Sequence, residues 1–320
     1  MRRVYIYNSF PISEEMLLGL GAGVGFIYWH QKGMPPFIGG RANARGEFEP
    51  LAGKRTGVQV TAHTTSSARA AERTLLEMLD SGQPAMIQCD MGFLPYFDFG
   101  GYDYHFGGHV VVVCGYNART RQVLVADRRE ELHPVSMEQL EKARASTFKP
   151  FPPKHRWYTF DFSRKRQPTG REVRQAIAEQ SKGMLAPPIS NLGVKGIRKA
   201  AESVLKWPAL MDESALRRAL FNAYISLDAT GGTGGGIFRY MFSRFLREVA
   251  GTTGDPRLNE IADTFQRIGD RWQDVAAMFQ RASAAKDVVV ALAETTSPMM
   301  ELADLEEAAW TRLQVLVQRS

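Results

Sequence analysis

The sequence predicts an α+β protein with a strand-rich domain over residues 1–165 and an all-helical domain over residues 166–320. Short runs of β-branched and aromatic residues, separated by turns, dominate the first part, as is typical of strands in a sheet. After residue 169 the apolar residues recur at helical spacing over long stretches. The basic segment 164–168, which ends in proline, lies between the two patterns and is typical of a linker.

The strands of the first domain are expected at residues 84–90, 110–113, 123–125 and 157–162. The polar residues 117–121 between the second and third of these strands predict a hairpin turn. Folding the hairpin about Arg119 brings Asp127 to about the level of His109, because an antiparallel pair matches residues equidistant from its turn. The sequence therefore predicts that these two side chains can meet.

The helices of the second domain are expected at residues 169–180, 194–205, 213–227, 236–250, 256–281 and 284–318. Each stretch carries apolar residues at helical spacing, and glycine or proline residues separate the stretches. An all-helical domain that follows a mixed α+β domain is the architecture that this pattern indicates.

His109 and Asp127 are the candidate catalytic residues. An imidazole at the end of an apolar strand is a good general base when a carboxylate fixes its tautomer and stabilises the imidazolium that forms. The alternative is a core histidine with a satisfied hydrogen bond and an aspartate that caps the turn before Arg128. For an isolated pair this alternative is favoured, so the decision depends on other features of the chain.

Neither of the two cysteines in the sequence is well placed as a nucleophile beside His109. Cys114 lies an odd number of residues from His109 on one strand, so we expect it on the opposite face, as a small core residue. Cys89 belongs to a predicted buried strand and not to a helix start, where a thiolate would be stabilised. The cysteines form no disulfide framework, which indicates a reducing compartment. Together with the histidines they show no metal-ligand spacing, so no metal is expected.

Three further residues are candidate substrate contacts. Asp90 and Tyr96 precede the strand of His109 and are expected to line the same cleft, although a turn aspartate and a core tyrosine are the alternatives. Arg239 follows the glycine-rich residues 231–236 by one helical turn, where a helix N-terminus favours a phosphate and an arginine can pair with an anion. The alternative for this segment is a flexible helix entry in a tightly packed region.

No cofactor site is expected from the glycines of residues 19–25, because no strand precedes them and no ribose-binding acid is suitably placed. The apolar run over residues 16–29 is too short to span a bilayer and is not a signal peptide, which predicts no membrane association and a cytoplasmic location. The net charge of +6 suits an acidic partner. Nucleic acid is not expected, because no basic run is interleaved with aromatic residues.

Several segments resemble, in order and spacing, the N-terminal domain of the butirosin biosynthesis protein H family: residues 13–28, Asp90 with 94–96, and 108–112 with 115–116. Residues 232–239 are similar to the helical domain of unknown function that usually follows it. The resemblance implies a papain-like fold of the cysteine-peptidase and acyltransferase type. It also implies transfer of an aminoacyl group from the thioester of an acyl carrier protein to an amine of an aminoglycoside-like small molecule.

In that family a His-Cys pair supplies the nucleophile, a little more than three helical turns before the segment that matches residues 13–15. By this resemblance the cysteine falls upstream of Met1, so either the start is assigned late or the nucleophile is lost. An acyltransferase, a cysteine peptidase or amide hydrolase of the same fold, and a noncatalytic module that binds a carrier protein or a small molecule all remain open. The acyl group, the acceptor and the oligomeric state are not determined by the motifs.

Overall fold

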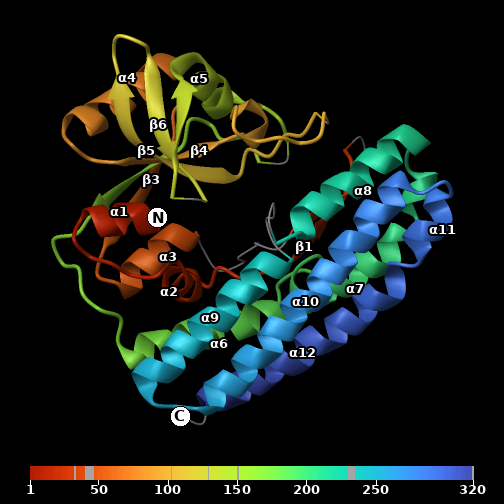
Figure 1. Cartoon of the computed structure of the whole chain (residues 1–320). Coiled ribbons are helices and arrows are strands. Elements are labelled where there is room, and N and C mark those ends of the chain that lie inside the picture. The colour runs from red at the N-terminus through yellow and green to blue at the C-terminus, as the bar shows by residue number, and fades with distance from the viewer. Residues whose placement is uncertain are drawn as a thin grey trace. The chain divides into compact units, whose positions relative to one another are not determined.

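The computed structural model describes residues 1–31, 34–39, 47–101, 103–128, 130–149, 151–229 and 235–318. The chain divides into two compact units, and each unit combines separate stretches of the sequence (Figure 1). The first unit is formed by Met1–Ser13 and Gly57–Arg166, and it contains the main sheet. The second unit is formed by Glu14–Thr56 and Gln167–Ser320, and it is mostly helical. The predicted α+β class is confirmed.

The structure groups residues 14–56 with the helical unit, whereas the sequence predicts a continuous first domain over residues 1–165. Helix α2 (Glu14–Leu20) contacts α9 (Gly236–Thr253) and α6 (Gly170–Leu185). The ring of Phe26 stacks on that of Trp272 with centroids 5.5 Å apart. The physical reason is that this segment is apolar over most of its length, so it needs a partner with a large hydrophobic surface, and the helices offer one.

The sheet of the first unit is antiparallel between neighbouring strands, with the order β3-β8-β4-β5-β6-β7. In that order the strands are β3 (Gln59–His63), β8 (Trp157–Asp161), β4 (Ala85–Cys89), β5 (His109–Asn117), β6 (Gln122–Ala126) and β7 (Leu132–Ser136). The four predicted strands correspond to β4, β5, β6 and β8, and the β5–β6 hairpin is confirmed. The sequence analysis did not predict β3 and β7, which are the edge strands of the sheet.

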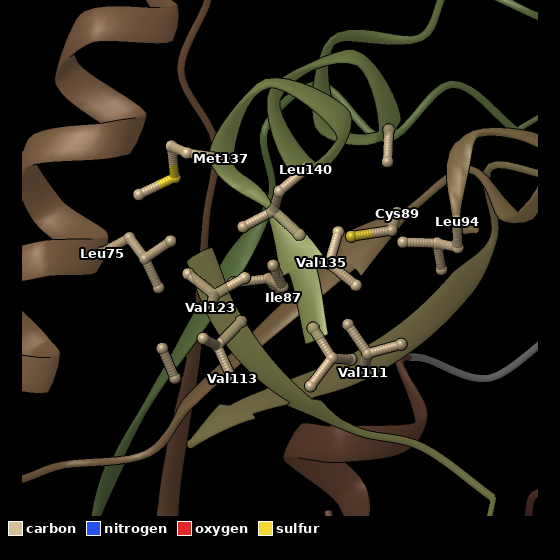
Figure 2. Packing of buried hydrophobic residues seen from close by; sticks show 13 residues of the cluster. Leu75, Ile87, Cys89, Leu94, Val111, Val113, Val123, Val135, Met137 and Leu140 are labelled. Atoms are coloured by element: carbon tan, nitrogen blue, oxygen red, sulfur yellow. The ribbon is translucent and has the colours of Figure 1, made fainter. Parts of the chain in front are cut away.

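One face of this sheet carries a core of buried aliphatic side chains from β4, β5, β6 and β7 (Figure 2). Helices α4 (Ala68–Asp80) and α5 (Met137–Ala145) contribute Leu75 and Leu140 to this core. On α4, Ser67 caps the first turn, and Ser136 forms a capping box with Gln139 at the start of α5. Each fully buried aliphatic side chain stabilises the folded state by about 1.5–3 kcal/mol, so this core holds the strands in register.

The opposite face of the sheet is contacted by the first helix, α1 (Arg2–Tyr7). The ring of Tyr5 meets those of Phe160 and Phe162 at 6.3 and 5.1 Å. Successive strand residues point to opposite faces, and Trp157 packs against the aliphatic core, so Phe160 lies on the other side of β8. Helices α4 and α5 thus pack on one face of the sheet, and α1 packs on the other face at β8.

The second unit contains a short hairpin, formed by β1 (Ile27–Trp29) and β2 (Phe37–Gly39), and a set of packed helices. Besides α2, α6 and α9, the helices are α3 (Phe48–Arg55), α7 (Gly193–Val204), α8 (Glu213–Leu227), α10 (Arg257–Ala284), α11 (Val288–Ala293) and α12 (Thr296–Gln318). Within the described residues, none of the helices is long and apolar enough to cross a membrane.

The single helix predicted over residues 284–318 is wrong, because the chain forms α11 and α12 there. Asp287 caps α11 by accepting hydrogen bonds from the backbone N–H groups of Val289 and Val290. Proline has no N–H and is tolerated only in the first turn of a helix, so Pro298 favours a new start at Thr296.

A fully buried ion pair lies in the core of the helical unit. The Nε of Arg239 on α9 donates to Oε1 of Glu306 on α12 at 2.6 Å, and both side chains are 0% exposed. Trp272 and Trp310 donate their indole N–H groups to the same carboxylate at 2.8 and 2.7 Å. Arg239 also donates to the backbone carbonyl of Gly25 at 3.0 Å, which ties the segment after α2 to the helices.

Arg239→Met should destabilise the protein strongly, because it leaves the Glu306 carboxylate buried without its cation. The expected loss is about 3–5 kcal/mol in the free energy of unfolding, measured by chemical denaturation. Arg198→Met is the matched control, since Arg198 forms partly exposed ion pairs with Asp304 and Glu307 on the same helix. That variant should lose about 1 kcal/mol or less. Equal losses in both variants would contradict the role of the buried pair.

Candidate functional site

His109 and Asp127 meet as the sequence predicted. His109 is the first residue of β5, and Asp127 directly follows the last residue of β6. The Nε2 atom of His109 lies 2.8 Å from Oδ2 of Asp127, and the side chains are 14% and 6% exposed. A largely buried imidazole whose ring nitrogen contacts a carboxylate has the geometry of a general base with its orienting group.

The hydrogen bond assigns different roles to the two ring nitrogens of His109. A carboxylate only accepts, so Nε2 must carry the proton in the contact with Asp127. In the neutral ring Nδ1 then has the lone pair and is the atom that can take a proton from a reacting group. The pair is therefore arranged for base chemistry at Nδ1.

Asp127 stays ionised because its environment compensates for its burial. Burial by itself acts to raise the pKa of this carboxyl group. The hydrogen bond and charge of His109, the charge of Arg128 and the hydrogen bond of Tyr96 act in the other direction, and together they hold the pKa below its ordinary value. At neutral pH Asp127 is thus an anion that can stabilise an imidazolium.

Tyr96, predicted as a substrate contact, belongs to the same cluster, where its hydroxyl points at the carboxylate. The phenol donates to Oδ2 of Asp127 at 3.0 Å. Its ring stacks on that of His133, with centroids 4.1 Å apart and an interplanar angle of 17°. Burial, followed by the neighbouring Asp127 charge, raises the pKa of Tyr96, so the hydroxyl keeps its proton.

The sequence analysis did not predict a cluster of aromatic side chains that lies beside His109. Phe97 meets the imidazole edge to face at 5.5 Å, and the guanidinium of Arg128 lies 5.2 Å from the centroid of the Phe97 ring. Phe99 stacks on Phe97 at 5.8 Å, and Tyr104 contacts Phe99 at 4.6 Å. The density of aromatic residues between positions 96 and 106 was the available signal. These rings give the base a mostly apolar neighbourhood on one side.

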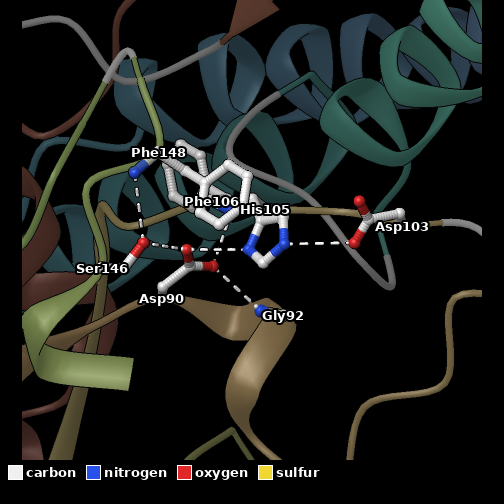
Figure 3. Close-up of polar contacts among 7 residues, drawn as sticks. All are labelled: Asp90, Gly92, Asp103, His105, Phe106, Ser146 and Phe148. Atoms are coloured by element: carbon white, nitrogen blue, oxygen red, sulfur yellow. Dashed lines mark hydrogen bonds and ion pairs between the residues drawn. The ribbon is translucent and has the colours of Figure 1, made fainter. Parts of the chain in front are cut away.

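Asp90 requires a correction, because its side chain is 0% exposed and its oxygens accept hydrogen bonds from the protein (Figure 3). The donors are the N–H groups of Gly92 and Phe106 at 3.0 Å and the hydroxyl of Ser146 at 2.5 Å, and Nδ1 of His105 lies 3.0 Å away. Asp90 therefore has no exposed oxygen for a substrate. We assign it the role of fixing the loop that leads into β5.

The loop around Asp90 is also fixed by ring stacking. His105 lies nearly parallel to Phe148, with ring centroids 3.4 Å apart and an interplanar angle of 5° (Figure 3). Its Nε2 atom is 3.1 Å from Oδ1 of Asp103. These contacts hold the residues just before His109, so the position of the base depends on them.

Cys89 is near His109 in the sheet but is not available for chemistry. The two residues are direct partners in the β4–β5 register, so their side chains share one face. Cys89 is 0% exposed within the aliphatic core, and burial raises the pKa of its thiol to about 12 (Figure 2). The thiol is therefore protonated and inert at neutral pH.

The expectation that Cys114 is a core residue is wrong, because its side chain is exposed. The β5–β6 register jumps from Val113 opposite Val125 to Gly115 opposite Leu124, which leaves Cys114 as the extra residue of a β-bulge. A bulged residue leaves the regular alternation of the strand, so the sequence spacing could not predict its exposure.

The prediction that Arg239 contacts a substrate is wrong as well, because its guanidinium is buried with Glu306 in the helical unit. The proposed phosphate loop at residues 231–236 lies outside the described residues over 231–234. Among the residues that the structure covers, no group of three or more His, Cys, Asp or Glu side chains is arranged to hold a metal ion.

The chain matches family models over most of its length. Residues 1–128 match the family described as butirosin biosynthesis protein H, N-terminal, which includes both His109 and Asp127. Residues 138–313 match the family described as domain of unknown function (DUF4872). No curated protein matches the chain. The order of the two matches is the order that the sequence resemblance indicated, and the first is consistent with a papain-like fold.

Asp127→Asn should reduce stability at neutral pH and have a smaller effect in acid. The pKa of Asp127 is lowered by folding, so its ionised form stabilises the folded state above about pH 4, the value for the unfolded chain. That contribution is lost as the pH falls through the lower pKa of the folded state.

The measurement is the free energy of unfolding of both proteins at pH 7 and pH 3. Asp98→Asn, at an exposed position in the same unit, is the control and should change little at either pH. A difference between Asp127→Asn and the unchanged protein that is equal at both pH values would contradict the assignment.

Proposed function

Because the chain belongs to the butirosin biosynthesis protein H-like family, we propose that it is a biosynthetic acyltransferase in which His109 is the general base and Asp127 its orienting group. The observation that carries the proposal is the 2.8 Å contact between Nε2 of His109 and Oδ2 of Asp127. This contact leaves Nδ1 of His109 as the proton acceptor and keeps the Asp127 carboxylate next to Nε2. The family match by itself supports a role related to butirosin biosynthesis. Acyl transfer is the more specific function that we propose.

In the proposed reaction, a cysteine thiol transfers its proton to Nδ1 of His109, and the thiolate attacks the carbonyl carbon of a carrier-protein thioester. The pantetheine sulfur leaves and takes the proton from the imidazolium. An amine then attacks the new thioester and gives a proton to Nδ1, which returns it to the departing cysteine sulfur. The amide product forms, and the thiol and the imidazole are regenerated.

The thiol is proposed to be the family cysteine that the resemblance places before residue 1. Cys89 is excluded by its burial and its raised pKa. Arg2 and Arg3, in the first turn of α1, form ion pairs with Glu130 at 3.4 and 3.1 Å. Because Glu130 follows Asp127 by three residues, the start of α1 lies beside the segment that leaves the base pair.

The donor is proposed to be an acyl carrier protein and the acceptor an amine of a small molecule, in the cytoplasm. The net charge of +6 favours encounter with an acidic carrier protein. A noncatalytic carrier-binding module is the second candidate, and the buried, protonated thiol of Cys89 favours it.

His109→Ala should abolish most of the transfer while leaving the fold intact. The assay uses the full reading frame with an acylated carrier protein and an aminoglycoside, and mass spectrometry follows the acylated amine. Loss of the base should lower the rate by about 10²–10⁴-fold. His30→Ala, at an exposed histidine of the other unit, is the control and should retain the activity.

Two outcomes would count against the enzyme. Equal activity in His109→Ala and His30→Ala would remove His109 from the mechanism. Binding of the carrier protein without transfer by the unchanged protein would favour the noncatalytic module.

A further inference from the structure

We propose that Tyr96 is a positioning residue that fixes the Asp127 carboxylate for His109, and that the stacked ring of His133 holds Tyr96 in place. The inference rests on the proposed function in one respect, namely that His109 acts as a base. It replaces the expectation that Tyr96 contacts the substrate.

Two donors converge on one carboxylate oxygen of Asp127. Oδ2 of Asp127 lies 2.8 Å from Nε2 of His109 and accepts from the Tyr96 hydroxyl at 3.0 Å. A carboxylate with one donor can still rotate about the bond to its Cβ, and χ2 of aspartate is broad. A second donor from a different direction restricts this rotation, so the oxygen stays opposite the imidazole.

Two neighbouring rings hold the phenol of Tyr96 in place. Tyr96 stacks on His133 at 4.1 Å and contacts the ring of Phe97 at 4.9 Å. His133 is the second residue of β7, and its backbone pairs with Val125 of β6. The ring that supports Tyr96 therefore belongs to the same rigid sheet as His109. A chain of direct contacts runs from β7 through Tyr96 and Asp127 to the base.

Toward Asp127, the hydroxyl of Tyr96 acts as a donor. Its hydroxyl is next to an anion and is sheltered from water, and both conditions favour the protonated phenol. Tyr96 does not contact His109 directly through its hydroxyl, so it does not exchange protons with the reacting groups. Its effect passes through the orientation of Asp127, which selects the tautomer with the proton on Nε2.

The decisive experiment reads the tautomer of His109 in the resting protein by ¹⁵N NMR of the imidazole. The unchanged protein should show mainly the Nε2–H tautomer, and Tyr96→Phe should show a mixture of the two. Tyr116→Phe is the matched control, since Tyr116 packs against the same aliphatic core at the far end of β5 and should leave the signal unchanged. A Tyr96→Phe spectrum identical to that of the unchanged protein would overturn the proposal.

A second pair of variants tests the stacked ring. His133→Phe keeps an aromatic ring behind Tyr96 and should preserve the His109 signal, whereas His133→Ala removes the ring and should reproduce the mixture seen with Tyr96→Phe. A normal signal in His133→Ala would show that the ring of His133 does not hold Tyr96.

Kinetics give a further readout if transfer is observed. Tyr96→Phe should lower kcat by about tenfold with KM nearly unchanged, since a hydrogen bond to a charged group contributes roughly this much. A rise in KM at constant kcat would indicate a substrate contact instead and would overturn the positioning role. The NMR result does not depend on acyl transfer, so a failure of the proposed function is distinguishable from a failure of this inference.

Discussion

The pairing of β5 with both of its neighbours is the constraint on which the first unit depends. Val111 and Val113 of β5 are fully buried, and they fix the register because a slip by one residue would turn them to the other face. The same slip would move His109 to the other face and separate it from Asp127. The hydrophobic core and the candidate base are therefore set by one register, because the pairing that buries Val111 and Val113 also brings His109 next to Asp127.

Two aspartates at the same end of the sheet have different physical roles. Asp90 is wholly enclosed, and two backbone N–H groups, the Ser146 hydroxyl and Nδ1 of His105 satisfy its oxygens, so it stabilises the loop before β5. Asp127 accepts from a phenol and contacts an imidazole that is still reached by solvent. Each carboxylate contacts an imidazole, but Asp90 is also held by two backbone N–H groups, whereas both donors to Oδ2 of Asp127 are side chains. Both residues are aspartates that directly follow a strand, so the difference between them lies in the groups that donate hydrogen bonds to their carboxylates.

The sequence predicted what depends on local alternation. The valine runs and the polar turn are enough to place His109 and Asp127 together, since a hairpin relates residues that are near in the chain. The bulge at Cys114 and the enclosure of Arg239 were not predictable in this way. The first breaks the alternation by one residue, and the second requires a partner 67 residues away. The packing of residues 14–56 with the helices is likewise a tertiary preference, which no local pattern encodes.

Cys89 shows why proximity to a base does not make a nucleophile. It faces the same side of the sheet as His109 from the neighbouring strand, yet its thiol is surrounded by aliphatic side chains. Burial raises the pKa of this thiol to about 12, so the reactive thiolate does not form to any useful extent at neutral pH. Exposing this thiol would also open a cavity in the core that fixes the register, so the position cannot serve both purposes. A thiol that works with His109 therefore has to approach Nδ1 from outside this core, where the strands need not move.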